Sequence, residues 1–219
     1  MTDPKRAAPM SNTEGHRRGS PGRPAPRGPK RPPGAPVGPE QVRSAVLDAA
    51  ARLFAEQGVS KVSLRDIAEG ADVDVGLIRR YVGVRDELID EVYRSVSSTL
   101  VAELEAKPLG QLDHGRQSNL GRWICLLSYY STRAIPAPAD GPDPILTLAS
   151  TLESENDLDS ATAKVRAAQV TAISIGWRLF EDHLVRSTGL SGLPVKMLRD
   201  DLTEIQRRIG AIPWPTAPE

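Results

Sequence analysis

The sequence predicts an all-α fold, and three observations support this prediction. Apolar residues recur three and four positions apart through most of the chain after residue 39, which is the period of a helix face. The segment 1–39 has ten of the 19 prolines, six of the 18 glycines and few large apolar residues, so we expect it to be disordered. The single cysteine, Cys125, excludes an internal disulfide framework and a cysteine-based zinc cluster.

The charge of the chain is unevenly divided. The 28 basic and 28 acidic residues give a formal net charge of zero. The segment 1–39 has eight basic and two acidic residues, a net charge of +6, so the remainder has a net charge of −6. Basic arms commonly accompany nucleic acid or acidic surfaces. The start of the chain lacks the apolar core of a signal peptide, and no stretch reaches the ~20 apolar residues of a membrane span. We expect a soluble, cytoplasmic protein that does not bind membranes.

Three helices are expected in the first part of the chain after the arm. The first runs from about residue 40 to Gly58, because glycine commonly stands just beyond a helix end. The second begins at Ser63, which can cap it, with Asp66 three positions later in a short version of the capping box. Residues 70–72 form a tight break, and a third short helix runs from about residue 74 to Tyr81.

Longer helices are expected in the second part. They span about 85–106, 112–133, 144–154, 160–187 and 194–209. The helix 160–187 has apolar stripes on two opposite faces, so both faces must be covered. Together with the last helix it could form a four-helix bundle with a second copy of the chain, or both stripes could be internal core of a monomer. The residues expected at a dimer interface are Ile175, Leu179, Leu198, Leu202 and Ile205.

Residues 43–89 resemble the DNA-binding domain of the tetracycline-repressor (TetR) family. The matching residues include Ala49, Ala50, Leu53, Phe54, Gly58, Ser63, Ile67, Ala68, Val73, Gly76, Ile78, Tyr81, Arg85, Glu87 and Leu88. The resemblance implies a bacterial transcription regulator, usually a repressor, that binds operator DNA as a homodimer. It also implies a C-terminal helical domain that usually binds a small effector and thereby releases the DNA.

This resemblance divides the chain into parts with different expected roles. Residues 40–88 would be a helix-turn-helix DNA-binding domain and residues 89–213 a helical domain for effector binding and dimerisation. Residues 1–39 would be a disordered basic Pro/Arg-rich arm, and residues 214–219 a tail. The arm could follow the DNA backbone or enter the minor groove, or it could be a solvated tail without a role.

The resemblance also implies which residues contact DNA. They are Ser63, Arg65, Val75, Gly76, Leu77, Arg79, Arg80, Tyr81 and Arg85. Gly76 would permit a close approach to the duplex, and Arg79 and Arg80 can reach guanine edges or phosphates. Tyr81 and Arg85 match positions that commonly bind phosphate in the family.

Four positions depart from the usual family pattern. Arg79 stands where the family usually has tyrosine, Val82 where it has phenylalanine, and Asp72 where it has glycine. Asp74 replaces the usual serine or threonine; it is a good helix cap, but its carboxylate would lie near phosphates. These substitutions bear on which operator is preferred rather than on the fold.

The second part of the chain contains candidate residues for an effector pocket. They are Trp123, Tyr129, Tyr130 and Trp177, because aromatic walls with a few polar groups suit a small organic ligand. An aromatic residue at helical spacing is more often plain core, so this alternative remains open. We see no nucleophile motif, metal-ligand spacing or phosphate-binding glycine loop, and therefore expect no enzyme activity, cofactor or metal.

The leading hypothesis from the sequence is a homodimeric TetR-type repressor that a small-molecule effector releases from its operator. The alternative is a sequence-tolerant protein that coats DNA through its basic arm.

Overall fold

A computed structural model describes residues 36–213, and the statements below concern that range. The tail 214–219 and all but the last four residues of the arm 1–39 lie outside it. The helices are α1 (Pro39–Gln57), α2 (Leu64–Gly70), α3 (Val75–Tyr81), α4 (Arg85–Ala106), α5 (Asn119–Arg133), α6 (Pro144–Asn156), α7 (Ser160–Ser187) and α8 (Val195–Gly210), with short 3-10 turns η1 (Leu109–Gln111) and η2 (Leu190–Gly192). The described part of the chain has no strand, which confirms the predicted fold class.

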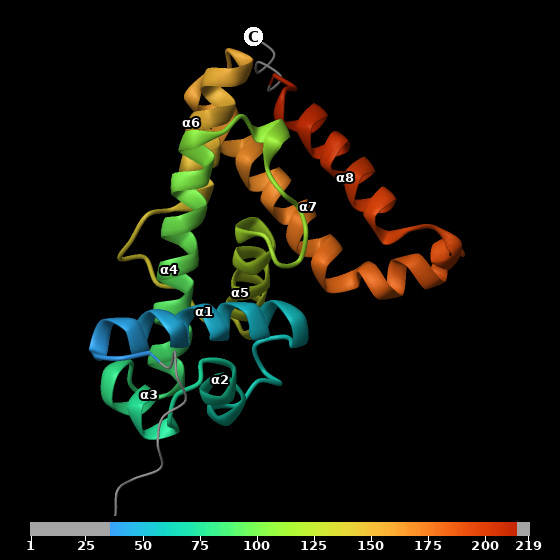
Figure 1. The fold of residues 1–219 in the computed structure, drawn as a ribbon. Coiled ribbons are helices and arrows are strands. Elements are labelled where there is room, and N and C mark those ends of the chain that lie inside the picture. The colour runs from blue at the N-terminus through green and yellow to red at the C-terminus, as the bar shows by residue number, and fades with distance from the viewer. Residues whose placement is uncertain (1–35, 214–219) are drawn as a thin grey trace, which may run out of the picture. The chain divides into compact units, whose positions relative to one another are not determined.

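The helices pack in two connected groups. Figure 1 shows α1 lying across α2 and α3, and α4 running from this group to α6. The helix α8 returns along α7 after the turn at η2. No helix in the described range is both long and apolar enough to span a bilayer. This range also holds no group of three or more His, Cys, Asp or Glu side chains that could bind a metal ion.

One continuous apolar core joins α1, α2 and α3 to α4 and α5. Its most deeply buried side chains include Phe54, Ile67, Ile78, Leu88 and Leu126, each at most 1% exposed. Burying a side chain of this size contributes about 1.5–3 kcal/mol relative to leaving it exposed. The helix α4 contributes to this core along most of its length, so it connects α1, α2 and α3 rigidly to the rest of the described chain.

The fifth helix begins later than the sequence pattern predicts. Instead of starting near residue 112, it starts at Asn119, because the Ser118 hydroxyl caps it by accepting from the Gly121 amide at 3.0 Å. The preceding chain turns at Asp113, whose carboxylate accepts from the Gly115 amide at 2.8 Å. A β-carbon on Gly121 would lie 2.1 Å from the Gly115 carbonyl oxygen, so only glycine fits this close approach.

The burial pattern of α7 also differs from the two predicted apolar stripes. Its best-covered positions include the small residues Ala163, Ala167 and Thr171, which follow one another at helical spacing. Small side chains allow α6 to pack closely there, with Ala149 and Leu152 against Ala167. The larger apolar side chains of the predicted stripes lie mainly in the C-terminal half of α7, where several are exposed.

Candidate nucleic-acid interface and internal cavity

A reciprocal pair of hydrogen bonds fixes the start of α2. The Ser63 hydroxyl accepts from the Asp66 amide at 3.3 Å, and the Asp66 carboxylate accepts from the Ser63 amide at 2.7 Å. The predicted capping box is therefore confirmed. The hydrogen bond from the Ser63 amide, with a smaller contribution from the Ser63 side chain, stabilises the charged carboxylate and holds the pKa of Asp66 below its usual value. Arg65 is exposed beside this cap, at the N-terminal end of α2.

A tight turn sets the angle between α2 and α3. Asp72 has a φ of 52°, a left-handed conformation that aspartate tolerates better than most residues. The Val73 amide closes the turn by donating to the Ala68 carbonyl at 2.9 Å. Asp74 then caps α3, because its carboxylate accepts from the Gly76 amide at 2.7 Å. Both unusual aspartates therefore have a structural role in the turn.

The helix α3 has one buried face and one exposed face. Ile78 is completely buried and fixes the helix against the core. On the other side Gly76, Arg79 and Arg80 are exposed, and the Arg80 guanidinium lies 5.4 Å from the centre of the Tyr81 ring. An exposed helix face with two cations, and with a glycine near its start, is suited to the major groove of DNA.

The nine predicted DNA-contacting residues differ in exposure. Ser63, Arg65, Gly76, Arg79 and Arg80 are exposed, whereas Val75, Leu77, Tyr81 and Arg85 are half-buried. The Arg85 guanidinium donates to two carbonyl oxygens of the loop before α2, those of Val62 at 2.5 Å and Val59 at 2.6 Å. Arg85 thus anchors the loop that precedes α2, a role that the sequence pattern did not indicate, and its contact with phosphate stays a prediction.

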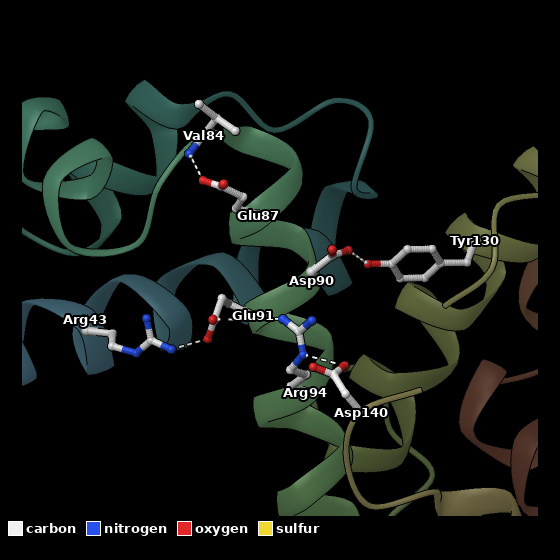
Figure 2. A network of polar contacts seen from close by, with 8 residues as sticks. All are labelled: Arg43, Val84, Glu87, Asp90, Glu91, Arg94, Tyr130 and Asp140. Carbon is white, nitrogen blue, oxygen red and sulfur yellow. Dashed lines mark hydrogen bonds and ion pairs between the residues drawn. The ribbon is translucent and has the colours of Figure 1, made fainter. Parts of the chain in front are cut away.

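Ion pairs hold α4 against its surroundings (Figure 2). Glu91 on α4 pairs with Arg43 on α1 and, at 3.9 Å, with Arg94. Arg94 in turn donates to Asp140, in the loop before α6, at 2.9 Å. The Arg94 guanidinium holds the pKa of the Asp140 carboxyl below its usual value. Such partly exposed pairs contribute modest energy, and their effect here is to orient α4 relative to α1 and the loop.

A second polar contact joins α4 to α5. The Tyr130 hydroxyl donates to the Asp90 carboxylate at 2.6 Å (Figure 2). Burial and the neighbouring carboxylate both raise the pKa of Tyr130, so the phenol stays protonated and remains a donor. The ring of Tyr130 also packs edge-on against Tyr93 and Tyr129, with centroids 5.3 and 5.5 Å away.

The second half of the described chain encloses a cavity of about 430 Å³, called the main cavity below. It lies between α4, α5, α6, α7 and α8. Its apolar wall includes Leu100, Leu104, Leu120, Trp123, Leu148 and Leu152. Its polar wall includes His114, Thr171, Ser174, Thr203 and Gln206. A cavity of this size and composition is typical of a site for a small organic ligand.

A smaller hollow of about 70 Å³, called the side pocket below, adjoins the main cavity. The two share His114, Leu120, Ile124, Ser174, Thr203 and Gln206 as wall residues. Beyond these, the side pocket is lined by Arg116, Trp177, Arg178, Glu181 and Arg199, among others. Burial lowers the pKa of His114 against the opposing effect of Asp113 and Asp200, so its imidazole is neutral at pH 7.

Side chains of the second half also bind backbone carbonyls near the C-terminal end of α1. The Arg178 guanidinium on α7 donates to the Ala55 carbonyl at 2.9 Å. The buried Cys125 thiol on α5 donates to the Phe54 carbonyl at 3.1 Å. The Gln117 side chain donates to the Arg52 carbonyl at 3.2 Å. The end of α1 therefore depends on residues that lie at or near the side pocket.

The structure brings only some of the predicted pocket aromatics together. Trp123 lines the main cavity and Trp177 the side pocket. Tyr130 lies in the core between α4 and α5, and Tyr129 lies at the surface under the Arg133 guanidinium, 4.1 Å from its ring centre. Neither tyrosine is among the wall residues of the two hollows. Both tyrosines have partners of their own in α4 and α5, which the sequence spacing did not indicate.

The predicted interface residues also fall into two groups. Leu179 and Ile205 are 44% exposed, and Leu198 is half-buried. Ile175, by contrast, packs against the core, and Leu202 lines the side pocket. Four exposed apolar side chains of α7 and α8 accompany the first group, although they are not among the predicted interface residues: Phe180, Leu184, Val195 and Met197.

Two capped helices joined by a tight turn, the second of which is short and exposes two arginines, define the helix-turn-helix class of DNA-binding proteins. The model of the family described as "Bacterial regulatory proteins, tetR family" matches residues 46–92. The HTH-type transcriptional repressor Rv3405c of Mycobacterium tuberculosis is 30% identical over 176 residues, which cover 80% of this chain and 92% of that protein. The chain belongs to the TetR family, and it is a helix-turn-helix transcription regulator.

Two further similarities are shorter or more distant. The repressor KstR2 of Mycobacterium tuberculosis is 35% identical over 60 residues, which cover 27% of this chain and 30% of that protein. A solved structure described as the "Molecular basis for control of antibiotic production by a bacterial hormones" superimposes with a TM-score of 0.51 at 18% identity. The superimposed region covers 77% of this chain and 97% of the chain in that structure, so the two share a fold.

Proposed function

We propose that this protein is a homodimeric repressor that binds operator DNA through α3 and that a small organic effector in the main cavity releases it. The observation that carries the proposal is the arrangement of α4. Its first turns pack in the helix-turn-helix core through Leu88, and Leu100 and Leu104 further along form part of the cavity wall. A ligand that displaces these leucines must therefore act on the same rigid helix that supports α3.

The proposed DNA contacts are those of the exposed face of α3. Arg79 and Arg80 would read base edges or bind phosphates, with Gly76 at the closest approach to the duplex. Ser63 and Arg65 would meet the backbone through the start of α2. Two recognition helices in a dimer must lie about one helical turn of DNA apart, ~34–36 Å, to bind two half-sites at once.

The first experiment selects operator sequences from random duplexes with the purified full-length chain and then measures their affinity by titration. Arg79→Ala and Arg80→Ala should each weaken binding by about 1–3 kcal/mol if the side chain reads a base, which is about 5- to 150-fold. Arg186→Ala is the matched control, because Arg186 is exposed on α7 and loses the same charge. Equal binding by all three variants would refute the proposed groove contact.

The same titration separates the repressor from a protein that coats DNA without sequence preference. A regulator should recover a common, two-fold related sequence and should keep it in the presence of excess unrelated duplex DNA. A coating protein should recover no common sequence and should lose the labelled DNA to the competitor, with a steep dependence on salt.

The proposed dimer uses the exposed apolar side chains of α7 and α8. These side chains lie on the C-terminal half of α7 and on α8. Homodimers commonly bury such apolar surfaces across a two-fold axis. The double variant Leu179→Glu with Ile205→Glu should sediment as a monomer. Leu146→Glu is the control, because Leu146 is 55% exposed on α6 rather than on α7 or α8. A dimer that persists in the double variant would overturn this assignment.

The proposed mode of release follows from these contacts. Ligand binding would shift α4, change the separation of the two recognition helices and thereby prevent simultaneous binding of both half-sites. The ion pairs of Glu91 and Arg94 and the Tyr130–Asp90 hydrogen bond would set the resting position of α4. A repressor of this kind needs no catalytic group and acts in the bacterial cytoplasm, on the chromosome.

A further inference from the structure

The charges around the side pocket are unbalanced in favour of cations. Its wall includes Arg116, Arg178 and Arg199, against the single carboxylate of Glu181. Both oxygens of Glu181 are already engaged, since Arg199 donates to them at 2.8 and 3.0 Å and Arg116 lies 3.5 Å from one of them. The Glu181 side chain is only 6% exposed, so this pairing is shielded from water.

Two further groups of the side pocket, on Arg178 and Trp177, are hydrogen-bond donors. Arg178 makes its hydrogen bond to a neutral carbonyl, that of Ala55, and has no carboxylate within ion-pair distance among the described residues. The indole N–H of Trp177 is buried and has no hydrogen-bond partner among the residues described. A buried donor without a partner costs free energy unless a ligand or water accepts from it. The Trp177 indole therefore lacks an acceptor, and the surplus of cations around it favours a negatively charged one.

The main cavity supplies the opposite environment. Its wall from α4, α5 and α6 is built largely from leucines and Trp123. Two of the three carboxylates in its wall are paired, Glu204 with Arg207 and Arg208, and Asp200 with Lys196. The third, Glu155, accepts from the Leu109 amide at 3.2 Å and has no cation within ion-pair distance among the described residues. The two hollows share six wall residues, so one molecule can occupy both.

From this arrangement we propose that the effector is an amphipathic carboxylate, whose apolar body fills the main cavity and whose anionic group occupies the side pocket. This inference rests on the proposed function, because it names the ligand class of the same cavity. The carboxylate accepts from the Trp177 indole and lies beside Arg116 and Arg178. The side pocket, at about 70 Å³, holds a group of that size but not a large polar ring.

The position of Arg178 gives this ligand class a regulatory consequence. The same guanidinium that faces the side pocket holds the last turn of α1 through Ala55. An anion in the side pocket competes with that carbonyl for the guanidinium. The carboxylate then weakens a contact between the ligand-binding half and the helix-turn-helix, in addition to the effect of the apolar body on α4.

The test uses three probes with the same ten-carbon chain, namely decanoate, 1-decanol and decylamine, below their micelle concentrations. Their binding to the purified protein is measured by isothermal titration calorimetry at pH 7.5. Decanoate should bind at least tenfold more tightly than decanol, and decylamine should bind most weakly. The proposal would be overturned if decanol bound as tightly as decanoate, if decylamine bound most tightly, or if none of the three bound.

Variants locate the anionic group. Arg116→Gln removes one charge and should weaken decanoate about tenfold while leaving decanol unchanged. Trp177→Phe keeps an aromatic ring but removes the donor, and should weaken decanoate severalfold. Arg186→Gln is the control, because Arg186 lies outside both hollows and loses the same charge. Equal effects of Arg116→Gln and Arg186→Gln on decanoate would refute binding in the side pocket, even if decanoate binds.

Operator release is measured separately, by titrating decanoate into the preformed protein–DNA complex. Decanoate that binds with the predicted preference but leaves the DNA bound would support the ligand class and contradict the proposed release mechanism. Decanoate that fails to bind would contradict the ligand class and leave DNA binding by α3 unaffected. The two proposals therefore fail by different results.

Discussion

Replacing Arg178 by methionine tests whether α7 holds the end of α1. The substitution keeps most of the aliphatic stem and removes the guanidinium that donates to the Ala55 carbonyl at 2.9 Å. The carbonyl belongs to the last turn of α1, where it has no intrahelical donor. The change therefore removes one hydrogen bond and one favourable charge from a helix C-terminus.

The expected loss follows from those two terms. A hydrogen bond to a charged group contributes about 1.5–3 kcal/mol, and because Arg178 is half-buried the lower part of that range applies. The cation at the helix C-terminus contributes a further ~0.3–1 kcal/mol. A total of about 1.5–3 kcal/mol corresponds to a decrease in Tm of about 3–12 °C for a chain of this size.

The assay compares Arg178→Met with Arg186→Met by urea and thermal unfolding of the full-length protein. Arg186 lies on the same helix, is exposed and should change stability by less than about 0.5 kcal/mol. Hydrogen exchange of the amides at the end of α1 should accelerate in Arg178→Met only. If both variants unfold at the same temperature and exchange equally, the contact does not hold α1 and the reasoning from Arg178 is wrong.

Three further substitutions test local features of the site. Asp74→Asn keeps a helix cap but removes a carboxylate near the proposed phosphate positions. Operator affinity, measured by titration, should therefore rise by up to about fivefold at unchanged Tm. Weaker binding would show that the carboxylate does not face the phosphates. Gly121→Ala places a β-carbon against the Gly115 carbonyl. It should lower the free energy of unfolding in urea by about 1–3 kcal/mol, despite the higher helix propensity of alanine. Wild-type stability would mean that the loop containing Gly115 can move away at little cost. In Arg85→Lys the single ammonium group cannot bind the Val59 and Val62 carbonyls as the guanidinium does. Tm should fall by several degrees with little change in operator affinity. An unchanged Tm with weaker operator binding would instead indicate a phosphate contact.

The features that the sequence predicted well depend on neighbours in the chain. The capping box at Ser63, the Asp74 cap and the bounds of α4 and α7 follow from residue types within one or two helical turns. The start of α5 was placed too early, at Leu112, which is the single large apolar residue of the segment 112–118. The Ser118 cap and the backbone contact of Gly121 decide where the helix begins.

The polar contacts were not predictable for a different physical reason. Arg85 has a suitable charge and place for phosphate, yet its guanidinium binds two carbonyls of a loop more than twenty residues earlier. Tyr130 was expected in a pocket, but Asp90 on α4 provides the acceptor for its hydroxyl. The register of one helix against another determines such partners. Residue spacing within a single helix carries no information about that register.

Glu181 shows most clearly how this register creates the site. In the sequence it stands next to the polar residues Asp182 and His183, so nothing nearby indicates burial. The return of α8 along α7 places Arg199 against it. One turn of α7 thereby carries both the buried carboxylate that fixes α8 and, in Arg178, the cation that fixes α1. Because that same turn lines the side pocket, a ligand bound there would contact both the α7–α8 and the α7–α1 connections directly. The proposed release of DNA would then not require a change to be transmitted through the whole core.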